Sequence, residues 1–114
     1  MMGSCASQTL IRPGDDHKVT THSKSVEDLF KALTLLKGQD EVARFLMDLC
    51  TPQEIKSFAE RWEIARLLDA GQLSYREISE ATKASTTTVA RVARFLKQED
   101  YNGYKIMLER LKDK

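Results

Sequence analysis

From residue 25 onward, one segment after another carries apolar residues at the spacing of an α-helix. Val26, Leu29, Phe30 and Leu33 fall on one face of the first segment, and this spacing predicts an amphipathic helix with one buried side. No segment alternates apolar and polar residues over a useful length, as a half-buried strand would. The sequence therefore predicts an all-α fold without β-structure.

Local start and stop signals divide this pattern into six expected helices. Ser25 and Asp28 resemble a capping box, and Thr51 with Pro52 and Glu54 forms the strongest helix start in the chain, because it combines a cap, a first-turn proline and a returning carboxylate. The predicted helices are Ser25 to Gly38, a segment around 42–49, Thr51 to Ala70, Ser74 to Thr82, Ser85 to Lys97, and a last segment around 104–111.

The helix expected from Thr51 to Ala70 has an unusually broad apolar surface. Phe58 and Trp62 lie on one side of it, and Leu67 and Leu68 on another, so several neighbours must bury it. Only about 90 residues form the folded part, which is too few to hide this surface within one subunit. We therefore expect an obligate or very stable homodimer.

Composition limits the remaining possibilities. The chain has 114 residues, a formal net charge of +1, 31% charged residues and two cysteines far apart in sequence. These values predict a single domain at 25–114, no membrane span, no disulfide framework and a cytoplasmic location. Residues 1–24 are polar and without apolar periodicity, so we expect a disordered N-terminal arm. Whether this arm contacts DNA stays open.

The segment from Leu73 to Leu96 predicts a helix-turn-helix. Its two helices must cross closely, and Ile78 supplies an apolar anchor beside the small Ser79. In the second helix an inward apolar stripe, formed by Val89, Val92, Ala93 and Leu96, leaves the other side of the helix facing outward. The side chains on that outer face are short and polar at the start of the helix and basic further along. This order suits contacts of the first residues with base edges and of the later residues with phosphates. The outward residues are Thr86, Thr87, Ala90, Arg91, Arg94 and Lys97.

From about residue 25 to the end, the chain resembles the Trp repressor family. The resemblance is carried by Leu49-Cys-Thr-Pro-Gln-Glu, by Leu67-Leu-Asp-Ala-Gly-Gln-Leu-Ser-Tyr-Arg-Glu-Ile and by Ser85-Thr-Thr-Thr-Val-Ala-Arg, and it is greatest to trp-repressor-like regulators that have not been characterised. It implies a six-helix intertwined dimer that binds double-stranded DNA through one helix-turn-helix per subunit. The residues expected at the DNA are Arg76, Ser79, Thr86, Thr87, Ala90, Arg94 and Lys97.

The same resemblance implies an effector pocket, in which two arginines of the repressor enclose a tryptophan. The corresponding residues are Arg61 and Arg91, but Val92 stands where the repressor has glycine and Phe95 where it has the serine that serves the ligand amino group. These larger side chains disfavour L-tryptophan as corepressor, and Phe95 could itself fill the space of an indole. Arg91 could then stack on Phe95, and Trp62 is better explained as core than as a ligand platform.

Other functions fit the sequence less well. Both histidines lie in the N-terminal arm, and the chain has no phosphate-binding glycine loop and no metal-spaced cluster, so we expect no catalytic residues, no metal site, no cofactor and no enzyme activity. The alternative is a helical protein-interaction module that does not bind DNA. The operator, the regulated genes, the direction of regulation and the identity of any small-molecule effector stay open.

Overall fold

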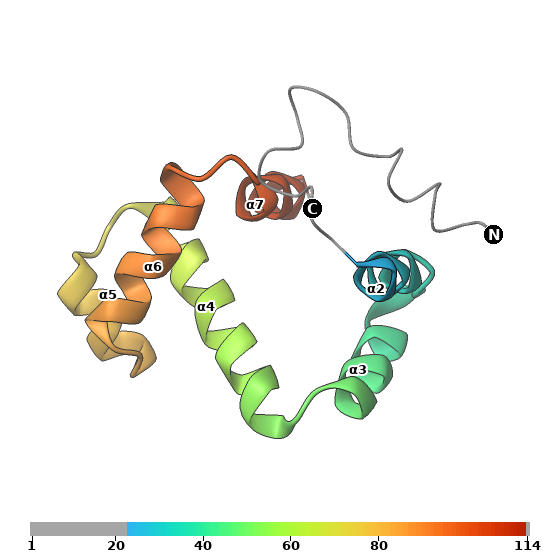
Figure 1. Ribbon diagram of the computed structural model, residues 1–114. Coiled ribbons are helices and arrows are strands. Elements are labelled where there is room, and N and C mark those ends of the chain that lie inside the picture. The colour runs from blue at the N-terminus through green and yellow to red at the C-terminus, as the bar shows by residue number, and fades with distance from the viewer. Residues whose placement is uncertain (1–22, 114) are drawn as a thin grey trace. The chain divides into compact units, whose positions relative to one another are not determined.

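Local capping interactions begin most helices of the computed structural model, which describes residues 23–113. Within that range the chain forms six α-helices and no strand (Figure 1). The all-α prediction is therefore confirmed. The helices are α2 (Lys24–Thr34), α3 (Gly38–Leu49), α4 (Pro52–Ala70), α5 (Tyr75–Thr82), α6 (Thr86–Lys97) and α7 (Gly103–Lys112).

The start and end of α4 are as predicted. The Thr51 hydroxyl accepts a hydrogen bond from the Glu54 amide at 3.1 Å, and the Glu54 carboxylate accepts one from the Thr51 amide at 2.8 Å. This reciprocal capping box satisfies amide groups that have no partner inside the helix. Gly71 closes the helix in the left-handed conformation, with φ 74°, which an L side chain adopts only at a cost.

The first helix starts differently from the prediction. The side chain of Ser23, not that of Ser25, accepts the hydrogen bond from the Val26 amide at 3.3 Å, so α2 begins at Lys24. The predicted cap at Ser25 was wrong, as was the end at Gly38, which with φ 80° begins α3. The predicted arm otherwise lies outside the described residues.

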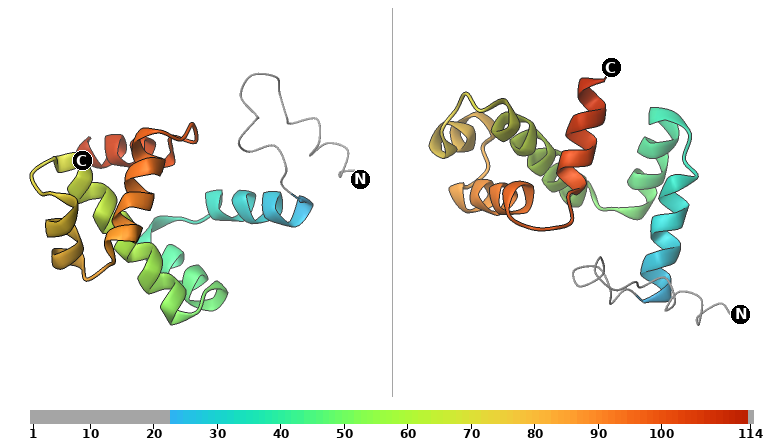
Figure 2. Two further views of the ribbon diagram at one scale, coloured as in Figure 1. Left: turned by 60° about the vertical axis from the view of Figure 1, so that its left-hand side comes forward. Right: turned by 90° about the horizontal axis from the view of Figure 1, so that it is seen from above.

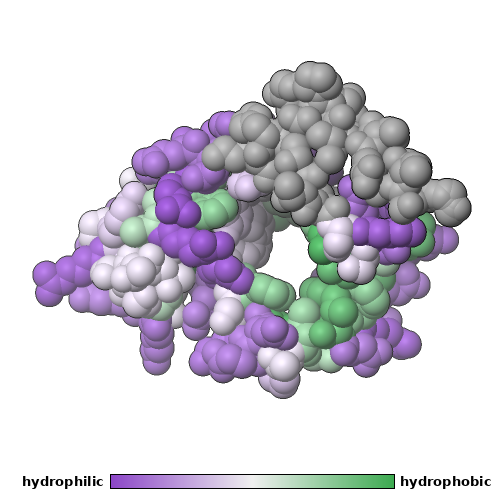
Figure 3. Space-filling view, viewed as in Figure 1, coloured by the Kyte–Doolittle hydropathy of each residue, from purple (hydrophilic) through white to green (hydrophobic). Residues whose placement is uncertain are grey.

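Residues 24–49 of the described chain form one compact unit, and its two helices bury none of their residues. Several large apolar side chains are therefore exposed in this unit, and Figure 3 shows hydrophobic residues gathered over α2 and α3. Both helices are amphipathic, and part of the apolar face of each stays exposed in this unit. The exposed residues are Phe30, Leu33, Leu35, Val42, Met47 and Leu49.

The second unit begins at Cys50 and contains the buried core. In it α4 packs against α5, α6 and α7, while α6 also packs against α5 and α7 (Figure 2). The predicted inward stripe of α6 is confirmed, because all four of its residues are buried. The core consists of Ile64, Ala65 and Leu68 of α4, Ile78 of α5, Ala84, Val89, Val92, Ala93 and Leu96 around α6, and Leu108 of α7.

Candidate nucleic-acid interface

Helix α5 begins with the second predicted capping box. The Ser74 hydroxyl accepts from the Glu77 amide at 3.1 Å, and the Glu77 carboxylate accepts from the Ser74 amide at 2.8 Å. Ile78 is fully buried against α4 and α6, as expected for the anchor of this short helix. An eight-residue helix is only marginally stable alone, so the cap and the anchor together hold α5 in place.

A three-residue turn, Lys83 to Ser85, joins α5 to α6. Lys83 adopts the left-handed conformation with φ 63°, and two hydroxyl groups of α5 fix the chain around it. The Ser79 hydroxyl donates to the Ala84 carbonyl, and Thr82 donates to the Ile78 carbonyl while accepting from the Ala84 amide. The half-buried Ser79, which we expected at the DNA, therefore holds the turn with its hydroxyl.

The N-terminal half of α6 presents small side chains to solvent. Ser85 caps the helix by accepting from the Thr88 amide at 3.0 Å, and the two hydroxyls lie 3.0 Å apart. Thr86, Thr87 and Ala90 are exposed because the opposite face of the helix enters the core. Short side chains at a helix N-terminus allow another molecule to approach the backbone closely.

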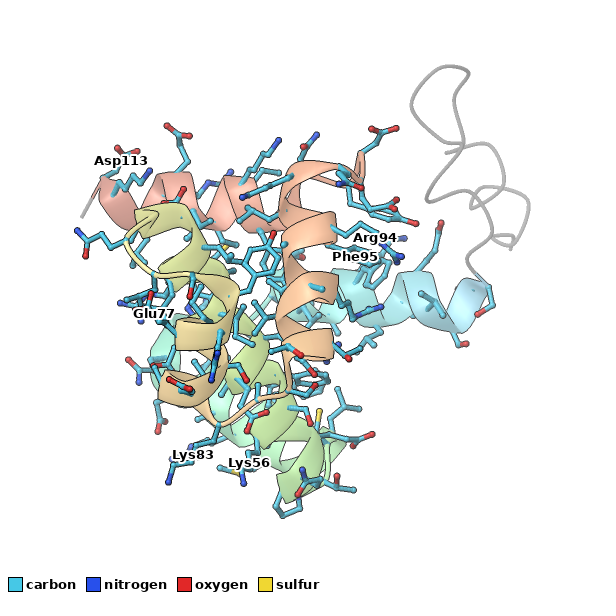
Figure 4. The ribbon with its side chains drawn as sticks, turned by 90° about the vertical axis from the view of Figure 1, so that its left-hand side faces the viewer. Lys56, Glu77, Lys83, Arg94, Phe95 and Asp113 are labelled. Atoms are coloured by element: carbon cyan, nitrogen blue, oxygen red, sulfur yellow. The ribbon has the colours of Figure 1, made fainter. Side chains whose placement is uncertain are left out.

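Cations follow on the exposed face of α6, at positions 91, 94 and 97. Arg91 and Arg94 both lie over the ring of Phe95, at 4.5 Å and 5.0 Å from guanidinium carbon to ring centroid. Figure 4 shows Arg94 and Phe95 on the same side of α6. The predicted stacking of Arg91 on Phe95 is confirmed, and the stack limits how far both guanidinium groups can move.

Two of the predicted DNA-contacting arginines are paired with carboxylates. Arg76 of α5 lies 3.7 Å from Glu80, and Arg94 lies 3.6 Å from Glu99, which follows the end of α6. Sequence reasoning missed both partners. The spacing of four residues between Arg76 and Glu80 could have revealed the first pair, whereas the second depends on how the chain turns after Gln98.

Three of the four predicted effector-pocket residues, Arg91, Val92 and Phe95, line one open cavity of about 540 Å³. Arg61 does not, since its guanidinium lies 5.2 Å from the Phe58 ring centroid. Trp62, which the sequence predicted to be a core residue, also lines the cavity. Sequence reasoning missed the four remaining lining residues, because their place depends on the path of residues 98–102. They are Tyr101, Gly103, Tyr104 and Met107.

Stacked aromatic pairs form two parts of this cavity wall. Phe95 stacks on Tyr101 with ring centroids 6.1 Å apart, and Trp62 stacks on Tyr104 at 6.5 Å. Trp62 also packs against the buried core, as expected for a core residue. Half of the lining residues are thus aromatic, and Arg91 is the one charged residue among them.

Within the described residues, no group of three or more histidine, cysteine, aspartate or glutamate side chains is arranged to hold a metal ion. None of the helices described is both long and apolar enough to cross a membrane.

The family model of the Trp repressor protein matches residues 24–112, which include all six helices. The chain belongs to the Trp repressor family. Its membership supports a DNA-binding regulator rather than an enzyme.

Known proteins resemble the chain over most of their length. It is 41% identical over 90 residues to the uncharacterized protein YerC of Bacillus subtilis (strain 168), covering 79% of this chain and 85% of YerC. A TrpR-like protein from Eubacterium eligens ATCC 27750 has a TM-score of 0.73 and 41% identity, over 79% of this chain and 91% of that one. A proposed Trp repressor from Staphylococcus aureus also has a TM-score of 0.73, with 30% identity over 82% and 91% of the two chains.

Proposed function

We propose that this Trp repressor family member is a sequence-specific transcription regulator that binds double-stranded DNA as a homodimer, with α5 and α6 as its helix-turn-helix. The observation that carries the proposal is the exposed face of α6. It begins with Thr86, Thr87 and Ala90 and continues with cations. The side chains of the first part are small enough to let the helix approach base edges, and the cations of the second part supply positive charge for contacts with phosphates.

The packing around α6 supports this proposal. α6 buries four apolar residues against α4, α5 and α7, and the hydroxyl groups of Ser79 and Thr82 fix the turn before it. A recognition helix must hold its side chains in one register along the groove. DNA binding by such a regulator also requires the compartment that contains the DNA, so we propose a cytoplasmic location.

A homodimer is supported by apolar surface that the described chain leaves exposed. α2 and α3 bury none of their residues, and Phe58 of α4 and Met107 of α7 are about half exposed. Exposed apolar surface on each of the two units is the kind of surface that protein interfaces bury. A two-fold dimer would present two equivalent copies of α6, and its operator would then be a pseudo-palindrome.

We further propose that DNA binding does not require tryptophan. Val92 is buried, and Phe95 already lies under the guanidinium group of Arg91, so Arg91 contacts a side chain of the protein where the family resemblance implies an indole. Arg61, the second arginine that the family resemblance implies, contacts Phe58 instead. Both observations argue against a slot for an indole, and leave open a different effector in the aromatic cavity.

Selection of bound duplexes from a random DNA pool tests the proposed function directly. We expect enrichment of one two-fold symmetric sequence from the pool without added tryptophan. Thr87→Glu should abolish that enrichment, because a carboxylate at the proposed base-contacting position repels DNA. If the wild-type protein enriches no sequence and is retained by no duplex even at low salt, it is instead the non-binding helical module.

A further inference from the structure

Glutamate side chains hold two of the arginines that the proposed function assigns to DNA. Oε2 of Glu99 lies 3.6 Å from Nε of Arg94, and Oε2 of Glu80 lies 3.7 Å from Nε of Arg76. The two pairs sit on adjacent elements, since α5 packs against α6. Both acidic residues therefore neutralise charge on the surface that would face the duplex.

The two pairs differ in how firmly they are held. The Glu99 side chain is only 22% exposed, and the guanidinium of Arg94 also lies over the Phe95 ring. Arg76 and Glu80 are 86% and 69% exposed and have only the neighbouring turn of α5 as support. Screening by water and salt weakens an exposed pair most, so the pair of Arg94 and Glu99 should persist better in solution.

Resting on the proposed function, we propose that Glu99, and to a smaller extent Glu80, set the affinity for DNA by occupying arginines that would otherwise contact phosphates. Carboxylate and phosphate oxygens both fit the donor pattern of a guanidinium group. An arginine that is already paired with a carboxylate releases fewer counterions from the duplex when the protein binds, and so contributes less to phosphate-driven binding. The glutamates thereby act as intramolecular competitors of the DNA backbone.

This competition has a consequence for recognition. Phosphate contacts drive non-specific binding, and a genome offers a very large number of non-specific sites. The chain as a whole has a formal net charge of only +1. With two surface arginines neutralised, binding should depend more on the small side chains at the start of α6 and less on charge alone.

Salt-graded binding to a mixed-sequence 30-base-pair duplex tests the proposal without knowledge of the operator. Glu99→Gln should bind roughly three- to tenfold tighter than wild type near 0.1 M salt, with a log–log salt slope steeper by about 1. Glu80→Gln should show a smaller gain. Asp40→Asn is the matched control, because it removes the same charge from an exposed pair, Asp40 with Arg44 of α3. It should bind as wild type does.

A double-mutant cycle separates competition from simple repulsion. If Glu99 acts by occupying Arg94, Glu99→Gln should change affinity little in an Arg94→Gln background. An equal gain in both backgrounds would mean that Glu99 merely repels the duplex, and would overturn the proposal. Thermal melting of each variant verifies that the proteins compared are folded.

The outcomes also distinguish this proposal from the proposed function. Wild-type binding that Glu99→Gln leaves unchanged in affinity and slope overturns only the role of Glu99. Absence of duplex binding by wild type, Glu99→Gln and Glu80→Gln alike, at low salt, overturns both.

Discussion

The guanidinium group of Arg91 lies over the ring of Phe95, with its carbon 4.5 Å from the ring centroid. The two residues are one helical turn apart on α6, so the contact forms within a single helix. Tyr101 covers Phe95 from the segment that follows the helix. Phe95 thus offers Arg91 a flat surface from within the protein, and the predictions for the effector pocket follow from that contact.

A dimer should melt at a temperature that depends on protein concentration. The exposed apolar faces of α2 and α3 need a partner, and dilution favours the dissociated, less stable chain. We expect the melting temperature to fall steadily over a hundredfold dilution. A concentration-independent melt together with a monomeric mass in sedimentation would contradict the dimer.

The two halves of the α6 surface should respond differently to mutation. Thr87→Glu should abolish binding to a selected operator, because it places negative charge where base edges are expected. Lys97→Ala should weaken binding to all duplexes alike and reduce the magnitude of the salt slope by about 1, since Lys97 is expected only at phosphates. If both variants bind as the parent does, α6 is not the recognition helix.

Lys83 should be a site at which glycine stabilises the protein. Its φ of 63° costs an L residue about 1 kcal/mol, and glycine relieves that strain at some cost in chain entropy. We expect Lys83→Gly to raise the free energy of unfolding by up to about 0.5 kcal/mol. Lys56→Gly, inside α4 just beyond its first turn, is the control and should lower the free energy of unfolding by roughly 1 kcal/mol. Urea denaturation measures both, and a loss of stability for Lys83→Gly would contradict the strain argument.

The sequence predicted those parts of the fold that depend on residues a few positions apart. The capping boxes at Thr51 and Ser74 and the buried stripe of α6 were correct, because caps and helical periodicity are local. The cap of α2 was not, because Ser23 and Ser25 both suit that position and only the path of the first turn selects one.

The candidate site was predictable to a lesser extent. The helical spacing of residues along α6 was enough to predict that Thr86, Thr87 and Ala90 lie on the exposed face. The same spacing predicted that Arg91 stacks on the ring of Phe95. The pairing of Arg94 with Glu99 and the placing of Tyr101 depend on the chain reversal before α7, where Asn102 adopts φ 62°. Asn102 followed by Gly103 favours a turn at that point, since asparagine tolerates the left-handed conformation, but this local signal does not specify which side chains the reversal brings together.

Tryptophan should not bind the wild-type protein at micromolar concentration, and its addition should not change DNA affinity. Val92 is 1% exposed, and forcing a ligand against such a packed wall typically costs about 1 to 3 kcal/mol, which is roughly a ten- to hundredfold loss of affinity. Phe95 also offers no hydroxyl group to the ligand ammonium. Calorimetric titration with tryptophan measures the first effect, and duplex binding with and without it measures the second.

Removing these two obstacles should create the binding that the wild type lacks. Val92→Gly with Phe95→Ser clears the wall, restores a hydroxyl group and releases Arg91 from its stack. Glycine within a helix costs about 1 kcal/mol, so the double variant could have too low a melting temperature for titration. In that case Phe95→Ser alone, which keeps Val92 in the core, replaces it in the experiment. We expect tryptophan to bind the double variant at least tenfold more tightly than wild type. Micromolar binding by the wild type, coupled to tighter operator binding, would show that the pocket opens despite Val92 and Phe95.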